Sequence, residues 1–86
     1  MITIHKFIVY VEDRPVVNMD PTARIVEVRP GPLSTLNVWA IVDTDHPLEP
    51  RQFAIHGTGH PIQPGERYVG TAPGPTFVWH LFEVAS

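Results

Sequence analysis

The stretch that decides the fold is Leu36-Asn37-Val38-Trp39-Ala40-Ile41-Val42-Asp43. Its even-numbered positions are all apolar, and Trp39 and Ile41 make the two middle odd-numbered positions apolar as well. A short apolar run of this kind is typical of a strand that is buried on two sides or that lies at a subunit contact. We therefore place it at the centre of a sheet.

Short strands are also predicted on both sides of this central one. Residues 24–29 precede it through Pro30-Gly31-Pro32, and this arrangement predicts a hairpin. Ten prolines and six glycines in 86 residues interrupt the chain too often for long helices. Further strands are expected at residues 3–12, 16–19, 51–56, 67–72 and 76–84. Seven short strands with Pro and Gly turns predict an all-β fold, a small antiparallel barrel or sandwich.

The length and the absence of cysteine limit how the chain can be stabilised. Residues 1–86 form one predicted domain, and a domain of this size buries about 60–65% of the surface that its unfolded chain exposes. Without cysteine there is neither a disulfide nor a thiolate metal site to compensate. Stability must then come from packing and association, so we expect a homo-oligomer.

The charge and hydropathy patterns disfavour two classes of partner. The formal net charge is −3, with six Lys and Arg residues, which weighs against binding of duplex nucleic acid. No stretch approaches the roughly 20 apolar residues of a membrane span, and the first residues do not resemble a signal peptide. We expect a soluble intracellular protein without a membrane contact.

The loop His56-Gly57-Thr58-Gly59-His60-Pro61 is the strongest candidate site. Its glycines allow successive backbone N–H groups to point at one anion, while its imidazoles add side-chain chemistry. It lacks the Gly-Lys-Ser/Thr of a P-loop and the third glycine of a dinucleotide fingerprint. The two glycines could therefore serve a ligand or merely permit a turn.

Four other side chains are candidates for the same ligand. Arg51 and Arg67 flank the loop in the sequence and could clamp an anion, although surface arginines are often simply solvated. Trp39 and Trp79 could stack on a base, or they could fill a core or an interface. His80, between Trp79 and Leu81, is better explained as a hydrogen-bonded core or interface residue than as a proton shuttle.

Metal and covalent chemistry find little support in the sequence. Five histidines, at positions 5, 46, 56, 60 and 80, show no HExxH or similar spacing, so no metal is expected. Residues 43–47 are better explained as a capped turn. Ser34 and Ser86 lie outside any nucleophile elbow, and cysteine is absent. We expect neither an enzyme nor a cofactor.

Several blocks of the sequence resemble a known family. The most specific are Gly57-Thr58-Gly59-His60-Pro61-Ile62 and Phe77-Val78-Trp79-His80-Leu81-Phe82-Glu83-Val84, supported by residues 4–6, 38–43 and 68–71. The chain resembles, over nearly its whole length, small bacteriophage and prophage proteins that form a domain of unknown function. Residues 12–22 and 72–75 match no part of that pattern. The resemblance implies phage origin and action in the cytoplasm of the infected bacterium, and it supplies no catalytic residues.

The leading functional hypothesis is a homo-oligomer that sequesters a small anionic, nucleotide-like ligand, such as a host defence signal. His56 and the amides of Gly57 to His60, with Arg51 or Arg67, would hold the phosphate, and Trp39 or Trp79 would cover the ring. The alternative is a protein–protein module that occludes a host protein. A third possibility is a hydrolase that uses His60.

Overall fold

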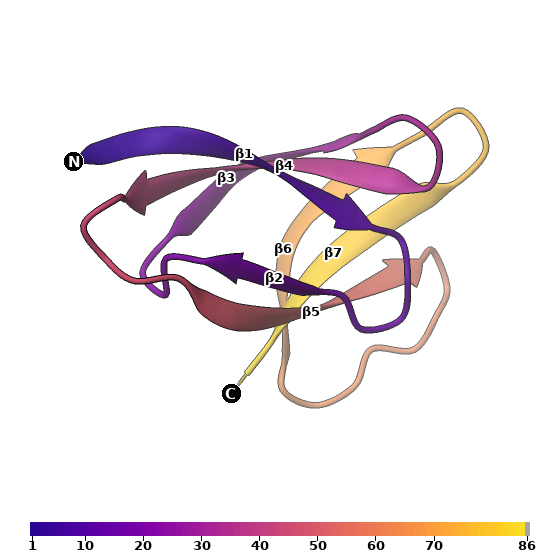
Figure 1. Ribbon diagram of the computed structural model, residues 1–86. Coiled ribbons are helices and arrows are strands. Elements are labelled where there is room, and N and C mark those ends of the chain that lie inside the picture. Colours follow the sequence, from indigo (N-terminus) through magenta and orange to yellow (C-terminus); the bar gives the residue numbers. More distant parts are fainter. Residues whose placement is uncertain (86) are drawn as a thin grey trace.

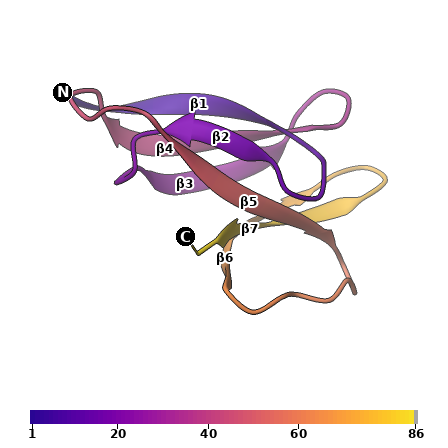
Figure 2. The ribbon, with the colours of Figure 1, turned by 60° about the horizontal axis from the view of Figure 1, so that its bottom comes forward.

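The computed structural model describes residues 1–85, and Ser86 lies outside the described part. Residues 1–85 contain seven strands and no helix, and the strands form two antiparallel sheets that pack as a sandwich (Figures 1 and 2). The all-β prediction is confirmed. Of the two predicted architectures, the sandwich is the one observed, because the two sheets do not close into a barrel.

All seven predicted strands are present, with shifts of a few residues at their ends. The strands are β1 (Ile2–Tyr10), β2 (Val16–Met19), β3 (Arg24–Pro30), β4 (Thr35–Asp43), β5 (Glu49–Gly57), β6 (Glu66–Pro73) and β7 (Val78–Val84). The largest shifts are at the end of β1 and at the starts of β5 and β7. Strand β5 starts earlier than predicted because Glu49 and Pro50 pair with Met19 and Asn18 of β2.

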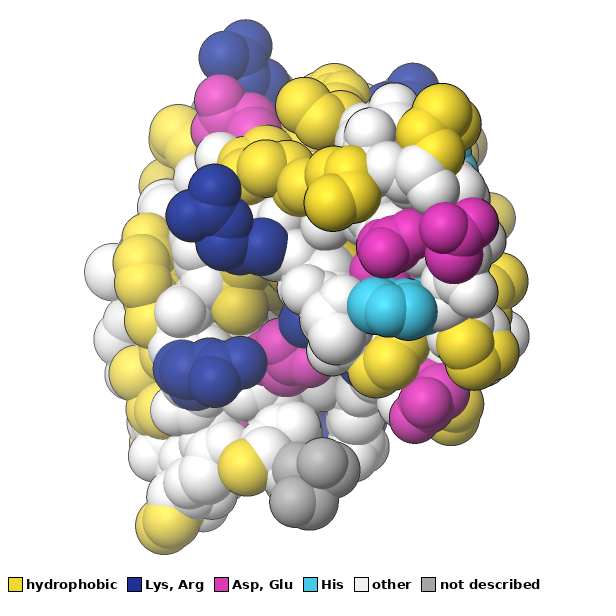
Figure 3. All heavy atoms as spheres, turned by 90° about the vertical axis from the view of Figure 1, so that its left-hand side faces the viewer, with side chains coloured by type: hydrophobic (Ala, Val, Ile, Leu, Met, Phe, Trp, Pro, Cys, Tyr) yellow, Lys and Arg dark blue, Asp and Glu magenta, His cyan; other side chains and the backbone are white. Residues whose placement is uncertain are grey.

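The first sheet has three strands in the order β1-β4-β3, so the predicted central position of β4 and the predicted β3–β4 hairpin are confirmed. The even-numbered side chains of β4 are buried, whereas the odd-numbered ones, including Trp39 and Ile41, are half-buried. One face of β4 therefore packs on the core and the other points outward. Hydrophobic side chains gather over this outward side in the upper part of Figure 3.

The second sheet has four strands in the order β2-β5-β7-β6. A bulge between Tyr68 and Gly70 lets β6 approach β3 of the other sheet. A Cβ atom on Gly70 would lie 2.7 Å from Cγ2 of Val28, so this close approach requires glycine.

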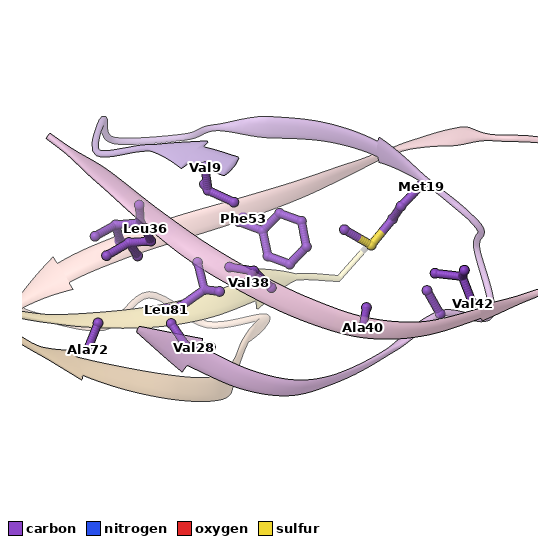
Figure 4. Packing of buried hydrophobic residues seen from close by; sticks show 12 residues of the cluster. Val9, Met19, Val28, Leu36, Val38, Ala40, Val42, Phe53, Ala72 and Leu81 are labelled. Atoms are coloured by element: carbon purple, nitrogen blue, oxygen red, sulfur yellow. The ribbon is translucent and has the colours of Figure 1, made fainter. Parts of the chain in front are cut away.

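The core lies between the two sheets and is centred on Phe53 (Figure 4). Only 1% of Phe53 is exposed, and it is the largest of the fully buried side chains. Around it lie Met19, Leu36, Val38 and Leu81, contributed by both sheets. Alternate positions of β4, β5 and β7 thus fill the interior, and the remaining positions of β5 and β7 face outward, where the candidate site lies.

Candidate functional site

A tight turn starts the loop between β5 and β6, which we call the 57–65 loop. The amide of His60 donates to the carbonyl oxygen of Gly57 at 3.1 Å, and the amide of Gly57 donates to Nδ1 of His60 at 3.1 Å. Gly59 has a φ of 91°, a conformation that L side chains rarely adopt. A Cβ atom on Gly57 would lie 3.1 Å from Cε1 of His60. The glycines therefore shape the turn and make room for the His60 ring.

Strand register brings further side chains beneath this loop. His56 of β5 lies directly opposite His80 of β7, and Phe82 of β7 lies opposite Tyr68 of β6. The Phe82 ring meets the His56 and Tyr68 rings edge to face, at centroid distances of 5.4 and 5.7 Å. This places Phe82 between a histidine and a tyrosine on the outer face of the four-stranded sheet.

A chain of hydrogen bonds passes through His80. Its Nε2 lies 2.9 Å from Oγ1 of Thr58, and its Nδ1 lies 3.0 Å from Oγ1 of Thr71. The Thr71 hydroxyl also lies 2.6 Å from the Tyr68 hydroxyl. The imidazole of His80 is thus fixed through both nitrogens, and it ties the 57–65 loop to β7 and β6.

A buried carboxylate anchors the other end of the loop. Glu66, whose side chain is 1% exposed, has Oε1 at 2.6 Å from Nε2 of His56 and accepts a hydrogen bond from the amide of Gln63 at 3.1 Å. Its Oε2 lies 3.4 Å from Nη2 of Arg14. Burial raises the pKa of Glu66, but the contacts with His56, Gln63 and Arg14 outweigh it, so the pKa lies below its usual value. Through these contacts the Glu66 carboxylate holds the loop against the sheet.

These elements line a shallow, open hollow of about 210 Å³, which we call the histidine pocket. Its lining consists of His56, Gly57, Thr58, Gly59, His60, Ile62, Tyr68, His80 and Phe82. Five of the nine sequence-predicted site residues therefore meet here. No hydrogen bond within residues 1–85 involves the amides of Thr58 and Gly59.

The two predicted arginines do not line the histidine pocket. Arg51 donates to both carboxylate oxygens of Glu83 at 2.7 Å, and its Nη1 donates to the carbonyl oxygens of Asp20 and Ala23. Arg67 is exposed, and its Nη2 lies 3.3 Å from Glu83. Both arginines line a separate hollow of about 450 Å³, which opens at the edge between the sheets on the face shown in Figure 3. Arg51 serves mainly to hold the sandwich together.

The two tryptophans also lie away from the histidine pocket. Trp39 is on the outward side of β4, in the other sheet, opposite Lys6 and Glu27. Trp79 packs against the core and lies 5.3 Å from Phe77, centroid to centroid. The aromatic residues that do line the pocket, Tyr68 and Phe82, follow from strand register. The sequence held one signal, the shared parity of His80 and Phe82 within β7, whereas Tyr68 on β6 could be placed only from the register.

Two further observations concern other kinds of site. Within residues 1–85, no group of three or more His, Asp or Glu side chains is arranged to hold a metal ion. The same part of the chain includes no helix that could cross a membrane.

A second polar cluster surrounds Asp20, in the turn between β2 and β3. Asp20 is buried and accepts hydrogen bonds from the amides of Thr22 and Asp43, each at 2.8 Å. Nδ1 of His46 lies 3.0 Å from Oδ1 of Asp20. The amide of Asp45 donates to Oδ1 of Asp43, so the predicted capped turn is confirmed. Burial raises the pKa of Asp20, but these hydrogen bonds outweigh it and the pKa falls well below its usual value.

This cluster predicts a pH-dependent contribution to stability. The hydrogen bond and charge of Asp20, with Asp43 and Asp45 nearby, raise the pKa of His46. A raised folded-state pKa stabilises the fold below the unfolded pKa of about 6.5, and this stabilisation is lost as the pH rises through the folded value. The melting temperature of the natural chain should therefore exceed that of His46→Gln by more at about pH 5.5 than at about pH 8.5. Equal differences at the two pH values, measured by thermal unfolding, would contradict this.

A family model described as a domain of unknown function, DUF7352, matches residues 1–86. The chain belongs to the DUF7352 family. The predicted membership of a family of unknown function is thus confirmed, while the phage origin stays a prediction. No curated protein and no solved structure matches the chain. Because the DUF7352 description assigns no activity, the function of the histidine pocket has to be argued from its geometry.

Proposed function

We propose that this DUF7352 protein binds a small anionic ligand that carries a ring, in the histidine pocket. One observation supports this above all others. The successive amides of Thr58 and Gly59, without acceptors in residues 1–85, stand at the rim of a pocket with an aromatic floor. Anion donors and an apolar ring surface therefore adjoin in one small hollow.

The rim is suited to the anionic group. Successive N–H groups in a turn with a positive φ form a concave donor set that fits a phosphate or carboxylate oxygen. The His60 ring lies against Gly57 with Nδ1 engaged, so its Nε2 remains to donate to a ligand. The nearby carboxylate of Glu66 lies 3.4 Å from the Arg14 guanidinium, which partly offsets its repulsion of an anion.

The floor is suited to a ring. The exposed Tyr68 presents most of the aromatic surface, the buried Phe82 beside it is only 7% exposed, and Ile62 extends the apolar surface from the loop. A hollow of about 210 Å³ is smaller than the roughly 300–1,000 Å³ of pockets that enclose drug-sized ligands. We therefore expect the enclosed part of the ligand to be one anionic group and one ring, as in a mononucleotide unit of a larger signal.

Binding without turnover fits the histidines best. Both nitrogens of His80 lie within hydrogen-bond distance of threonine hydroxyls. Because neither nitrogen is free, His80 is suited to hold the loop and the strands together rather than to exchange protons with a ligand. The proposal includes the role expected from the sequence, sequestration of a nucleotide-like defence signal inside a phage-infected bacterium.

Calorimetric titration with adenosine monophosphate, adenosine and inorganic phosphate tests this proposal. Adenosine monophosphate should bind more tightly than adenosine or phosphate, because it can contact both the amides at the rim and the aromatic surface at the floor of the pocket. Tyr68→Ala and His60→Ala should each weaken its binding about tenfold, through loss of stacking surface and of a rim donor. Tyr10→Ala and His5→Ala are matched controls, because both residues are exposed and lie on the other sheet. The absence of heat with all three probes, or equal losses in the controls, would count against the histidine pocket.

A further inference from the structure

The outward side of the three-stranded sheet exposes several large apolar side chains close together. We call this surface the β1-β4-β3 face. Ile2, Ile4, Ile8 and Tyr10 of β1 are 72, 57, 55 and 68% exposed, and Val26 at the β3 bulge is also exposed. Half-buried Trp39 and Ile41 lie beside them on β4. Contiguous exposed apolar surfaces of this kind usually mark an interaction site.

Charged residues cross this face in a defined row. Lys6 of β1 and Glu27 of β3 both lie directly opposite Trp39, so a cation and an anion flank the indole ring on the two sides of β4. The next rows toward either end of β4 carry Ile4, Ile41 and Arg24 in one direction, and Ile8, Asn37 and Arg29 in the other. On its β1 side the face therefore carries a positive group only in the row of Trp39. In that same row the β3 residue, Glu27, is negative.

We propose that the β1-β4-β3 face binds the same face of a second copy of this chain, about a two-fold axis parallel to β4. Such an axis exchanges the β1 and β3 sides, so Lys6 lies over the partner's Glu27 and Glu27 lies over the partner's Lys6. It also sets Trp39 and Ile41 over their own counterparts, with the arginine stems covering Ile4 and Ile8.

The charges select this axis over the other simple choice. A two-fold axis perpendicular to the strands through the Trp39 row would place Lys6 over Lys6 and Glu27 over Glu27 of the second copy. It would also place Arg24 over Arg29. Like charges in contact weaken association, whereas the parallel axis forms two opposite-charge pairs around an apolar centre.

The size of the face suits a modest interface. Nine-residue strands span about 30 Å, and three strands about 14 Å, so the flat projection is roughly 420 Å² per copy. Projecting side chains add to this area, which brings the pair near the roughly 1,000 Å² total expected of a specific interface. We therefore expect reversible dimers that dissociate on dilution.

This dimer goes beyond the proposed ligand binding and does not depend on it. The histidine pocket lies on the outer face of the four-stranded sheet, on the opposite side of the sandwich from the β1-β4-β3 face. Each copy therefore keeps a complete and open pocket, and failure of one proposal leaves the other standing.

Sedimentation of two charge-reversal variants, separately and mixed, tests the dimer. Lys6→Glu places two acidic groups at each crossing, and Glu27→Lys places two basic groups there, so each variant alone should associate about tenfold or more weakly than the natural chain. An equimolar mixture should regain association, because every crossing between one variant and the other again joins an acidic group to a basic one. Both positions are exposed, so the folds should persist, which circular dichroism can verify. Arg67→Glu, an exposed reversal on β6, is the matched control and should associate like the natural chain.

Three results would overturn this dimer. The first is a natural chain that stays monomeric at about 500 µM, a concentration that should populate even a modest complex. The second is full association of either single variant, which would indicate pairing through a strand edge or another face. The third is a mixture that associates no better than its components, which would leave the face for a different protein partner.

Discussion

Replacing Phe53 by alanine is expected to lower the free energy of unfolding by about 3–5 kcal/mol. The ring fills the centre of the interior between the sheets, and it is 1% exposed. Met19, Leu36 and Leu81 around it come from three strands in two sheets, so they cannot collapse into the space without moving a strand. The loss should therefore include a cavity contribution as well as the lost transfer free energy.

Urea denaturation followed by tryptophan fluorescence measures this effect. Phe77→Ala is the matched control, because Phe77 is largely exposed and precedes β7, and its loss should cost less than about 1 kcal/mol. Since small domains of this size have marginal stability, Phe53→Ala should leave the chain close to unfolding at 25 °C. A cost for Phe53→Ala no greater than for Phe77→Ala would show that the core is not centred on this ring.

Removing Arg51 alone is the second change with a large expected effect. Arg51→Met should destabilise the fold by about 3–5 kcal/mol, because it leaves the largely buried carboxylate of Glu83 without its two-pronged partner. It also leaves the carbonyl oxygens of Asp20 and Ala23 without their donor. The contact with Arg51 is the largest cause that lowers the pKa of Glu83, so the carboxylate, left with only the exposed Arg67 at 3.3 Å, should titrate at higher pH in the variant.

A double-mutant cycle separates the net contribution of the Arg51–Glu83 pair from the cost of burying one of the two charges without the other. Arg51→Met combined with Glu83→Leu should recover much of the lost stability, since no uncompensated charge is then buried. Arg29→Met supplies the comparison with an exposed pair, because Arg29 meets Glu27 at 3.2 Å on the surface and should contribute less than about 1 kcal/mol. If Arg51→Met and Arg29→Met had equal effects, Arg51 would not be a structural tie and could again be considered for a ligand.

The sequence predicted the strands well because their signals are local. Proline and glycine mark the turns, and the apolar runs between them are too short for helices, so β1 to β7 could be located to within a few residues. The two-faced apolar pattern of β4 correctly predicted its central place. The pattern could not show which face of β4 packs on the core and which one points outward. Periodicity reports which residues share a face and not what covers that face.

The candidate site was predictable in part for the same reason. The 57–65 loop and its histidines form a local motif, so His56 and His60 could be found directly. The side chains that surround this motif depend on the register between strands that are far apart in the sequence. That register places Phe53 opposite Glu83 and Tyr68 opposite Phe82. Proximity in sequence to the loop was therefore a poor guide for Arg51, whose side chain points inward to Glu83 instead.

The central claim is that the 57–65 loop forms a ligand site with the sheet beneath it. A ¹H–¹⁵N correlation spectrum recorded during titration with adenosine monophosphate tests it most directly, because it locates the contact residue by residue. We predict saturable shifts of the Thr58 and Gly59 amides, together with those of Tyr68 and His80. Shifts confined to Arg24 and Arg67 around the other hollow, or no shifts at all, would contradict the claim.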